Sequence, residues 1–446
     1  MNRIFKRSKW LYAIGGIFAV AIIVLLFTML IQAKTWVSQP YNKHMVTSSG
    51  SIYDRNGTVL VSTKNGERTY NADSAIRKAT LHVVGDSEGF ISTGAQTAFR
   101  SQLTGYNLIN GLYASDSKKN DLTLTIDAEL SVTAYKALGN YKGCIGVYNY
   151  KTGEILCAVS TPTYDPANKP DDIDDSSDNY KAIYMNRFFS GTYTPGSTFK
   201  IITSACALEN VSNIESMTFT CPGYFTTKSG SKVKCNSTHG TVTFKQGLNR
   251  SCNTEFAQIA CNLLTNDEMM STAKEFGFGK TIEVNGIKCA SSTFDLSDAY
   301  DIDRAWAGIG QYTTMVNPCH EITILGAIAN KTGVTPNPTL IYGSRGGNLS
   351  YCSSNIARKL NDLLRSNVTD YYKDSKFPNL EMCGKTGTAQ VSNGNPHTWF
   401  AGYSQRDDLP LCIVVVLENS GGYGLTNAIP VANTVMQKAL SLYANS

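Results

Sequence analysis

The longest apolar stretch of the chain lies near its N-terminus, where residues 11–31 contain no charged side chain. At a rise of about 1.5 Å per residue, a helix of this length spans about 31 Å, which matches the roughly 30 Å hydrocarbon core of a bilayer. Trp10, Tyr12 and Trp36 lie near its two ends, where aromatic side chains anchor helices at membrane interfaces. The pattern therefore predicts one transmembrane helix.

The residues before this helix indicate its orientation, because they include Arg3, Lys6, Arg7 and Lys9. By the positive-inside rule, residues 1–10 should stay in the cytoplasm, and everything after the helix should lie outside the cell membrane. A cleaved signal peptide is the alternative interpretation. The apolar run is long for that type, and residues 31–33 form a poor cleavage site. We therefore expect an uncleaved, single-pass anchor.

The segment after the anchor, residues 32–121, is polar, dotted with glycine and only weakly periodic. Within it, residues 48–60 predict two short strands around a turn at 54–57. No grouping of side chains there suggests catalysis. We expect a small β-rich extracytoplasmic pedestal that joins the anchor to a larger domain of residues 122–446.

The larger domain alternates strand-like and helical patterns. Residues 122–138 begin with alternation and pass into an amphipathic helix, and residues 143–162 indicate two apolar strands joined by a turn. Three further strand-like runs precede a final amphipathic helix at 429–443; the runs are 381–390, 397–403 and 411–419. This order predicts an α/β fold, with an antiparallel sheet whose first and last strands meet and with helices on both faces.

Composition fits a globular protein, since 42% of the 446 residues are hydrophobic and 17% are charged. The net charge is only +5, and no dense basic stripe follows the first ten residues, so nucleic acid is not an expected partner. Twelve cysteines in an exported chain would ordinarily suggest disulfides. Five of them lie in apolar runs and should instead be buried as small hydrophobic residues: Cys144, Cys157, Cys206, Cys261 and Cys412.

Two other cysteines, Cys221 and Cys235, flank an excursion rich in Gly, Lys and Ser. A disulfide between them is an open alternative, because connectivity does not follow from sequence. Together with His239 they would supply three ligands of a zinc site, but their spacing matches no tight Cys-x-x-Cys knuckle. We therefore expect no metal and no organic cofactor.

Nucleophilic chemistry is suggested by Ser197 and Lys200, which form a Ser-x-x-Lys sequence in the stretch YTPGSTFK. Pro195 and Gly196 mark a turn, and residues 201–208 continue as an apolar helical run, so Ser197 should lie in the first turn of a helix. The lysine then shares its face. A hydroxyl at such a position gains unpaired backbone N–H groups, the positive end of a helix dipole and an amine that can accept its proton.

The Ser-x-x-Lys spacing alone is weak evidence, because the chain repeats it at Ser115/Lys118, Ser229/Lys232, Ser231/Lys234 and Ser271/Lys274. What selects Ser197 is the later occurrence of Ser251-Cys252-Asn253 and Lys385-Thr386-Gly387-Thr388. Other copies of these two patterns fit other roles. Lys151-Thr152-Gly153 is expected in a hairpin turn, Lys331-Thr332-Gly333 at a helix end and Ser177-Asp178-Asn179 in an acidic loop, while Ser353-Ser354-Asn355 is a further copy.

With these three patterns in order, the chain resembles the class B penicillin-binding proteins, which are membrane-anchored peptidoglycan D,D-transpeptidases. The resemblance covers nearly everything after the anchor. It also rests on the stretches NRFFSGTYTPGSTFK, GEILCAVSTPTYDP, GIGQYTTMVNP and WFAGY. There are two departures: Ser49-Gly50 replaces the usual Arg-Gly of the pedestal, and Tyr312 replaces a glycine that is common after Gly-Gln.

The resemblance implies a role for each residue of the three patterns. Ser197 would attack the carbonyl between two D-alanines of a stem peptide and form an acyl-enzyme, while Lys200 would accept its proton. Ser251 would relay a proton to the departing amine, and Asn253 would hold a backbone amide of the substrate. The remaining assignments are a substrate carboxylate site at Lys385, Thr386, Gly387 and Thr388, and an oxyanion hole formed by the backbone N–H groups of Ser197 and Thr388.

A proton acceptor at Lys200 requires a shifted pKa. With an ordinary pKa of about 10.4, its deprotonation at pH 7 would cost roughly 4.6 kcal/mol. Burial and a neighbouring cation should lower that pKa, and Lys385 is the candidate cation. Because a lysine fills the role of base, His239 and His397 are expected to be structural.

The fate of the acyl-enzyme distinguishes several enzymes of this type. An amine acceptor gives a cross-link, whereas water gives a D,D-carboxypeptidase. A β-lactamase is disfavoured because no Glu-x-x-x-Asn element lies between Ser251 and Lys385. A catalytically silent β-lactam-binding or regulatory scaffold would tolerate loss of Lys200, Ser251 or Lys385, yet all three are present.

The expected partners follow from this resemblance. They are peptidoglycan stem peptides, β-lactams as inhibitors and the membrane. The roughly 90 residues between anchor and catalytic domain are too few for a glycosyltransferase domain. Family analogy therefore suggests a separate membrane-embedded glycosyltransferase as a partner.

Overall fold

The computed structural model describes residues 2–37, 49–65, 67–106, 120–171, 173, 177, 179–392 and 394–444. The predicted acidic loop and its Ser177-Asp178-Asn179 copy lie partly outside these residues, and the Ser115/Lys118 pair lies wholly outside them.

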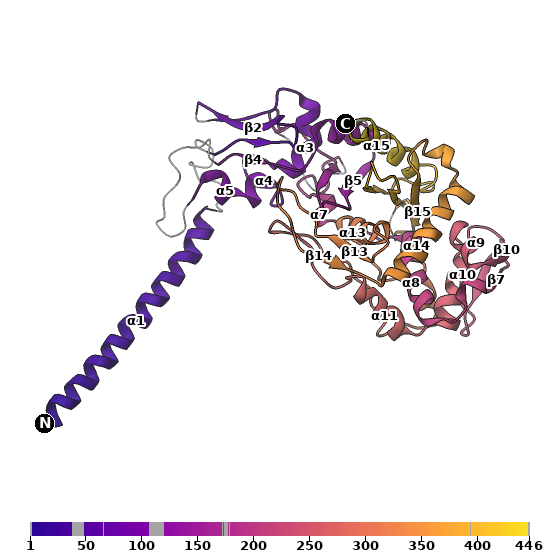
Figure 1. The fold of residues 1–446 in the computed structure, drawn as a ribbon, viewed down its shortest axis with the longest axis horizontal. Coiled ribbons are helices and arrows are strands. Elements are labelled where there is room, and N and C mark those ends of the chain that lie inside the picture. The colour runs from indigo at the N-terminus through magenta and orange to yellow at the C-terminus, as the bar shows by residue number, and fades with distance from the viewer. Residues whose placement is uncertain are drawn as a thin grey trace.

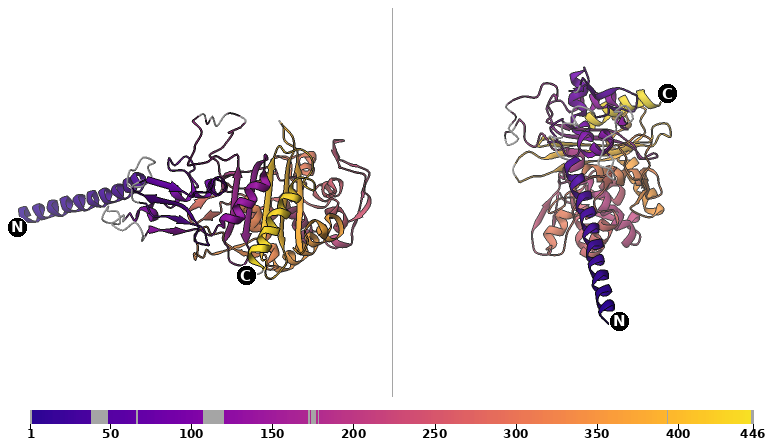
Figure 2. Two further views of the ribbon diagram at one scale, coloured as in Figure 1. Left: turned by 90° about the horizontal axis from the view of Figure 1, so that it is seen from above. Right: turned by 90° about the vertical axis from the view of Figure 1, so that its left-hand side faces the viewer.

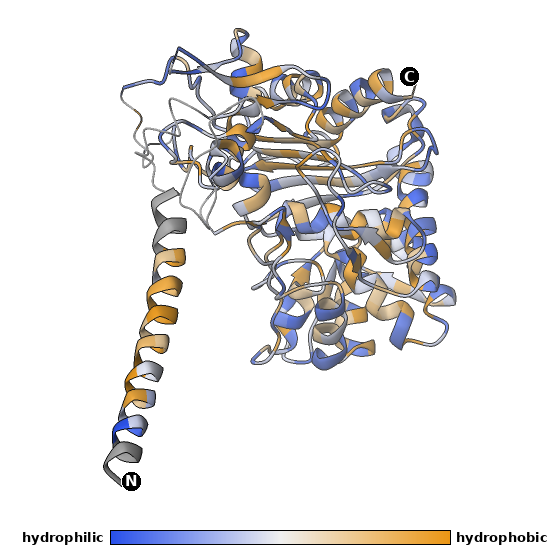
Figure 3. Cartoon of the chain, turned by 60° about the vertical axis from the view of Figure 1, so that its left-hand side comes forward, coloured by the Kyte–Doolittle hydropathy of each residue, from blue (hydrophilic) through white to orange (hydrophobic). Residues whose placement is uncertain are grey.

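Helix α1 (Asn2–Val37) extends away from the remainder of the molecule in Figure 1. Among the described residues, its stretch Arg7–Ile31 is the one helical segment long and apolar enough to cross a membrane. The hydropathy colouring of Figure 3 shows this helix as predominantly hydrophobic.

The pedestal contributes three strands to a four-stranded sheet of order β3-β2-β1-β4, whose fourth strand, β4, consists of the first two residues of the larger domain. The predicted hairpin is confirmed, because β1 and β2 pair in antiparallel fashion around a turn in which Gly57 has a φ of +84°. In the described part of the pedestal, three helices that the sequence analysis did not predict accompany the sheet. The elements are β1 (Ile52–Tyr53), β2 (Val59–Lys64), β3 (Glu67–Tyr70), β4 (Leu122–Thr123), α3 (Ser74–Val84), α4 (Ala95–Ala98) and α5 (Arg100–Thr104).

The larger domain is built on a five-stranded sheet of order β15-β16-β17-β5-β6. Every neighbouring pair is antiparallel, and the pairing of β17 with β5 joins the last strand of this sheet in chain order to its first, as predicted. Strands β6 and β17 are nearly continuous apolar runs because both faces of the sheet are covered there. The strands of the sheet are β5 (Lys142–Asn149), β6 (Ile155–Thr161), β15 (Met382–Ala389), β16 (His397–Ser404) and β17 (Leu411–Glu418).

Helices cover the two faces of this sheet, as Figures 1 and 2 show. On one face, α6 (Ala128–Leu138) and α15 (Ala428–Tyr443) pack against β6 and β17 around a core that includes Val415 and Val435. On the other face lies α13 (Pro318–Ala329), which contacts β5, β16 and β17, with α14 (Ser354–Ser366) and α8 (Lys200–Asn210) beyond it. Helix α13 is buried along its whole length, so it forms the centre of the helical layer.

A smaller lobe, residues 218–258, extends from the helical layer and holds two separate two-stranded sheets. Strands β7 (Thr218–Cys221) and β10 (Gly240–Thr243) form the first, and β8 (Tyr224–Thr226) and β9 (Lys232–Lys234) form the second. The lobe ends in the short helices α9 (Phe244–Asn249) and α10 (Asn253–Gln258). Other helices and strands of the larger domain include α7 (Arg187–Ser190), α11 (Asn266–Glu275), β11 (Glu283–Val284), β12 (Ile287–Lys288), α12 (Asp301–Ala307), β13 (Val334–Pro336) and β14 (Asn348–Ser350).

The alternative copies of the sequence patterns have structural explanations. Lys151 and Thr152 lie in the turn between β5 and β6, where Gly153 has a φ of +86°, so the predicted hairpin is confirmed. Lys331 follows the end of α13 with a φ of +59°. Ser353 caps α14, because its side chain accepts a hydrogen bond from the backbone N–H of Ile356.

The cysteines predicted to be buried are buried with one exception. Cys144, Cys157, Cys206 and Cys412 are enclosed, whereas Cys261 is only half-buried. Helix α10 passes into a wider turn at residues 259–263, which leaves this cysteine at the lobe surface. All twelve cysteines are free thiols in the structure, so the alternative of a disulfide between Cys221 and Cys235 is not realised there.

Candidate active site

Ser197 lies in a single 3₁₀ turn, η2 (Gly196–Thr198), that leads directly into α8, close to the predicted position. Two glycines bring this turn against edge strand β15. A Cβ atom on Gly196, whose φ is +55°, would lie 2.6 Å from the carbonyl oxygen of Thr388, and one on Gly387 would lie 2.5 Å from that of Pro195. Side chains at these two positions would force the turn away from the strand. The glycines therefore allow the Ser197 segment and the Lys385 strand to meet.

Lys200 is the first residue of α8, and its side chain is fully buried. Its Nζ donates hydrogen bonds to the carbonyl oxygen of Ser251 at 2.8 Å and to Oδ1 of Asn253 at 2.9 Å. A longer bond of 3.3 Å reaches Oγ of Ser251. These contacts tie the nucleophile helix to the second sequence pattern.

Lys385 extends from β15 to the same hydroxyl. It is also fully buried, and its Nζ donates to Oγ of Ser251 at 2.9 Å. Two ammonium-bearing side chains therefore converge on one serine. In the described part of the chain, no hydrogen bond joins Ser197 to either lysine, so Ser251 is the group that links the three patterns.

The two buried lysines have lowered pKa values. Burial lowers the pKa of Lys200 to about 8, while the thiols of Cys252 and Cys235 and the carboxyl of Glu255 act in the opposite direction. Burial and, after it, the charge of Lys200 lower the pKa of Lys385 well below its usual value. We expected burial and the charge of Lys385 together to lower the pKa of Lys200. Burial acts at Lys200 as expected, whereas the repulsion between the two amines acts on the pKa of Lys385.

Ser251 and Asn253 flank the cap of α10, but neither of them is the cap. The cap is Cys252, whose sulfur accepts a hydrogen bond from the backbone N–H of Glu255 at 3.4 Å. Ser251 has a φ of +54°, a left-handed conformation that costs free energy in any residue other than glycine. Such strain persists only where the surroundings hold it, and here both lysines bind the serine.

A cavity of about 770 Å³ lies beside these side chains. Its walls include Ser197, Ser251, Asn253, Thr386 and Thr388 from the three sequence patterns. A hydroxyl nucleophile, a hydroxyl relay and lysines able to lose their protons are the groups that acyl transfer requires. The cavity is large enough for a peptide end, since small-molecule sites range from about 300 to 1,000 Å³.

The sequence analysis missed Tyr372, which lies in the turn at residues 367–372. Its hydroxyl is within 3.0 Å of Oγ1 of Thr386 and also accepts a hydrogen bond from the backbone N–H of Thr386 at 3.0 Å. It lines the cavity beside Thr386. A single tyrosine in an irregular segment has no spacing pattern that could have identified it.

His397 has a structural environment. Its Nδ1 accepts a hydrogen bond from the backbone N–H of Asn419 at 2.9 Å, and its ring packs edge-on against Tyr193. Tyr312 adopts a φ of +62°, which explains why a glycine is usual at this point of the family pattern. His239 has different neighbours, which are three cysteines.

Comparisons with known proteins agree with this fold and site. Residues 143–437 match the penicillin binding protein transpeptidase domain. The peptidoglycan D,D-transpeptidase PbpA of Mycolicibacterium smegmatis is 25% identical over 401 residues, which cover 79% of this chain and 81% of that protein. The D,D-transpeptidase domain of a peptidoglycan glycosyltransferase from Eggerthella lenta is 26% identical, with a TM-score of 0.73 over 89% of this chain and 99% of that one.

A third similar structure is penicillin-binding protein A from M. tuberculosis in an imipenem acyl-enzyme complex. It has a TM-score of 0.76 over 90% of this chain and 99% of that one, at 23% identity, and so it supports the fold. The family model spans well over half of the present chain. The chain therefore belongs to the penicillin-binding protein transpeptidase family, whose members are serine acyl-transfer enzymes.

Proposed function

We propose that this protein is a membrane-anchored peptidoglycan D,D-transpeptidase that cross-links stem peptides through an acyl-enzyme on Ser197. The observation that carries this proposal is the convergence of two buried lysines on the hydroxyl of Ser251, in the wall of a cavity that Ser197 also lines. The names of the relatives support the same reaction and substrate.

In the first step, Oγ of Ser197 attacks the carbonyl carbon of the penultimate D-alanine. The serine proton passes to an uncharged lysine, and Lys200 is the candidate because burial lowers its pKa to about 8. The developing oxyanion is held by the backbone N–H groups of Ser197 and Thr388. The loss of one such donor typically costs about 3 to 4 kcal/mol of transition-state stabilisation.

In the second half of acylation, the proton returns to the leaving amine of the terminal D-alanine. Ser251 is the relay, since its hydroxyl accepts hydrogen bonds from both Lys200 and Lys385. Asn253 holds a backbone amide of the stem peptide next to this hydroxyl. Breaking the peptide bond releases D-alanine and leaves the acyl group on Ser197.

Lys385, Thr386, Gly387 and Thr388 bind the terminal carboxylate of the donor peptide. A carboxylate at this point favours the charged form of Lys385 and forms charge-assisted hydrogen bonds. The recharged Lys385 then opposes a charge on Lys200, so binding of the substrate favours the uncharged base. Tyr372 orients the hydroxyl of Thr386 toward this site.

Deacylation by an amine of a second stem peptide completes the cross-link. A β-lactam acylates Ser197 in the same way, but its leaving amine stays tethered to the acyl group. The long-lived adduct makes β-lactams inhibitors of the protein.

The helix Arg7–Ile31 serves as an uncleaved anchor with residues 1–10 in the cytoplasm. Residues 11–31 form the membrane span, residues 32–121 the extracytoplasmic pedestal and residues 122–446 the catalytic domain. By family analogy, a membrane-embedded glycosyltransferase is the partner that polymerises the glycan.

A product assay tests this function directly. The detergent-solubilised chain is supplied with a D,D-stem peptide and an acceptor amine, with the Ser197→Ala variant as control. Cross-linked product that requires Ser197 is the expected result. Free tetrapeptide as the sole product would show a D,D-carboxypeptidase, and a protein with neither product nor covalent penicillin label would be a silent scaffold.

A further inference from the structure

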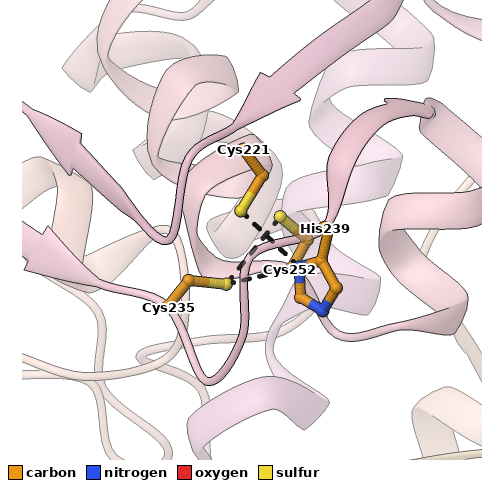
Figure 4. Close-up of side chains that lie close together, drawn as sticks. All are labelled: Cys221, Cys235, His239 and Cys252. Carbon is orange, nitrogen blue, oxygen red and sulfur yellow. Dashed lines mark hydrogen bonds between the residues drawn. The ribbon is translucent and has the colours of Figure 1, made fainter.

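Four side chains outside the proposed chemistry meet at one point of the small lobe, as Figure 4 shows. Cys221 ends β7, Cys235 follows β9, His239 precedes β10, and Cys252 caps α10. Their three sulfur atoms and one ring nitrogen all lie within 4.8 Å of one another. Residues separated by up to 31 positions in the sequence thus bring three thiols and one imidazole, all potential metal ligands, to a common centre.

The separations agree with a tetrahedral zinc site. With Zn–S near 2.3 Å and Zn–N near 2.05 Å, a regular tetrahedron has S···S edges of about 3.8 Å and S···N edges of about 3.5 Å. In the structure, Nδ1 of His239 lies 3.6 Å from Sγ of Cys221 and 3.5 Å from Sγ of Cys235. Sγ of Cys235 lies 3.9 Å from Sγ of Cys252.

The same distances disfavour a disulfide as the explanation of the cluster. The 3.9 Å between the sulfurs of Cys235 and Cys252 is nearly twice the bond length of about 2.05 Å. A disulfide would join two of the cysteines and would require no imidazole nitrogen at the same point. Backbone N–H groups also donate to two of the sulfurs, from Asn253 to Cys235 at 3.2 Å and from Glu255 to Cys252 at 3.4 Å. Such donors orient and stabilise metal-bound thiolates.

The small lobe contains a two-stranded ribbon that a cross-link would stabilise. Its β8–β9 ribbon buries one residue, Val233, and an isolated two-stranded ribbon is only marginally stable in water. Segments with too little apolar core are commonly stabilised by a structural metal. The cluster lies where the two ribbons and α10 meet.

We propose that Cys221, Cys235, His239 and Cys252 bind one Zn²⁺ as a closed, four-coordinate structural site. Three thiolates and one imidazole in tetrahedral arrangement select zinc among the common divalent cations. This proposal replaces the sequence-based expectation of no metal. The ligand that the sequence analysis missed is Cys252, because it lies inside the Ser251-Cys252-Asn253 pattern and far from the other three.

The proposed zinc site acts on the proposed active site by fixing the positions of the residues next to its ligands. Cys252 is bonded on one side to Ser251, whose φ is +54°, and on the other to Asn253, which accepts a hydrogen bond from Lys200. Cys235 itself contributes to the cavity wall. With its four positions filled by protein, the metal has no open coordination site for substrate, and it holds the strained turn that presents Ser251 and Asn253. All four ligands are therefore positioning residues.

The test uses the full chain, purified in detergent without chelator or added reductant, and measures metal by inductively coupled plasma mass spectrometry. We expect one zinc per chain in the parent protein and in Ser197→Ala. Cys235→Ser and Cys221→Ser should each lose most of the zinc, whereas Cys261→Ser, in the same part of the molecule but outside the cluster, should retain it. Exchange with Co²⁺ should give the intense near-ultraviolet absorption of cobalt thiolates.

Function supplies a second readout. Removal of the metal should slow acylation by a fluorescent penicillin about 10²-fold, because small displacements of positioned groups have effects of that size. Readdition of Zn²⁺ should restore the rate in the parent protein. Where a ligand variant fails to fold, the zinc content and cobalt spectrum of the parent protein still decide the question. A parent chain without zinc, or one whose alkylation pattern shows a disulfide among these cysteines, would overturn the proposal.

Discussion

The two sides of the cavity are built in different ways. On the sheet side, Lys385 lies on β15 of a five-stranded sheet whose apolar side chains are buried on both faces. On the cysteine side, Ser251 and Asn253 lie in a lobe whose two-stranded ribbons meet at a cluster of three cysteines and a histidine. The lobe has an apolar cluster of its own, which includes Phe219 and Phe256, but the turn that carries Ser251 is held by a few specific contacts.

This difference concerns precision as much as stability. A sheet with continuous hydrogen-bonded register fixes the position of Lys385 within a large cooperative unit. Ser251 has no such framework, and its left-handed conformation is maintained by two lysines and by the neighbouring Cys252. The comparison predicts that changes on the sheet side alter the stability of the whole domain. Changes on the cysteine side should alter reaction rates and metal content first.

The largest expected effect follows from the lysine of α8 that binds the turn on the cysteine side. Lys200→Met removes the amine that bonds to both Ser251 and Asn253. Loss of a general base typically slows a reaction about 10²- to 10⁴-fold, and we expect that loss in acylation by penicillin. Stopped-flow or gel-based labelling measures it, with Lys245→Met as control because Lys245 is exposed and pairs with Asp370. An unchanged rate in Lys200→Met would remove Lys200 from the mechanism.

The next prediction compares how much a substitution on each side lowers the free energy of unfolding. Phe400 is fully buried in β16 and packs against Phe377 with ring centroids 5.1 Å apart, so Phe400→Ala should destabilise the domain by about 3 to 5 kcal/mol. Phe225 is half-buried in β8, and Phe225→Ala should cost about 1 kcal/mol. Thermal unfolding of the detergent-solubilised chain compares them. Equal losses would contradict the proposed contrast.

The pH dependence of acylation tests the state of the buried amines. Burial lowers the pKa of Lys200 to about 8, and only an uncharged amine accepts a proton. The acylation rate should therefore rise about tenfold per pH unit below about pH 8 and level off above it. Because Lys200 and Lys385 interact, the measured pKa belongs to the pair. A rate that stays flat between pH 6 and 9 would exclude an amine base with this pKa.

The smallest effect concerns Tyr372, which contacts Thr386 through its hydroxyl. Tyr372→Phe removes two hydrogen bonds without changing the ring, and a net loss of about 1 kcal/mol corresponds to roughly fivefold weaker acylation. Titration with penicillin at fixed time measures it, with the exposed Tyr300→Phe as control. Identical titrations for the two variants would show that Tyr372 has no part in orienting Thr386.

Sequence predicted the sheet side well for physical reasons. Apolar runs bounded by turns determine strands such as β5, β6 and β17, and their order along the chain determines the antiparallel sheet. Ser197, Lys200, Ser251 and Lys385 were singled out because the chemistry predicted for them depends on short fixed spacings. The structure adds that the two lysines meet at Ser251.

The cysteine side was harder to predict because its contacts join residues far apart in sequence. Cys221, Cys235 and His239 are separated irregularly, and Cys252 had been assigned only as the middle of a sequence pattern. Helix α3 of the pedestal was missed because it lies in a segment that is polar and dotted with glycine overall, although Asp73 caps its start. Tyr372 belongs to neither a regular element nor a motif. Each of these features is defined by tertiary contacts rather than by local pattern.

The central claim is that Ser197 is the acylated residue of a cavity formed by both sides. The most direct measurement is peptide mapping by mass spectrometry after the full chain has reacted with penicillin. The account predicts one acyl group per chain, located on the peptide that contains Ser197 and absent from Ser197→Ala. An acyl group on Ser251 or on any other residue, or none in the parent protein, would contradict it.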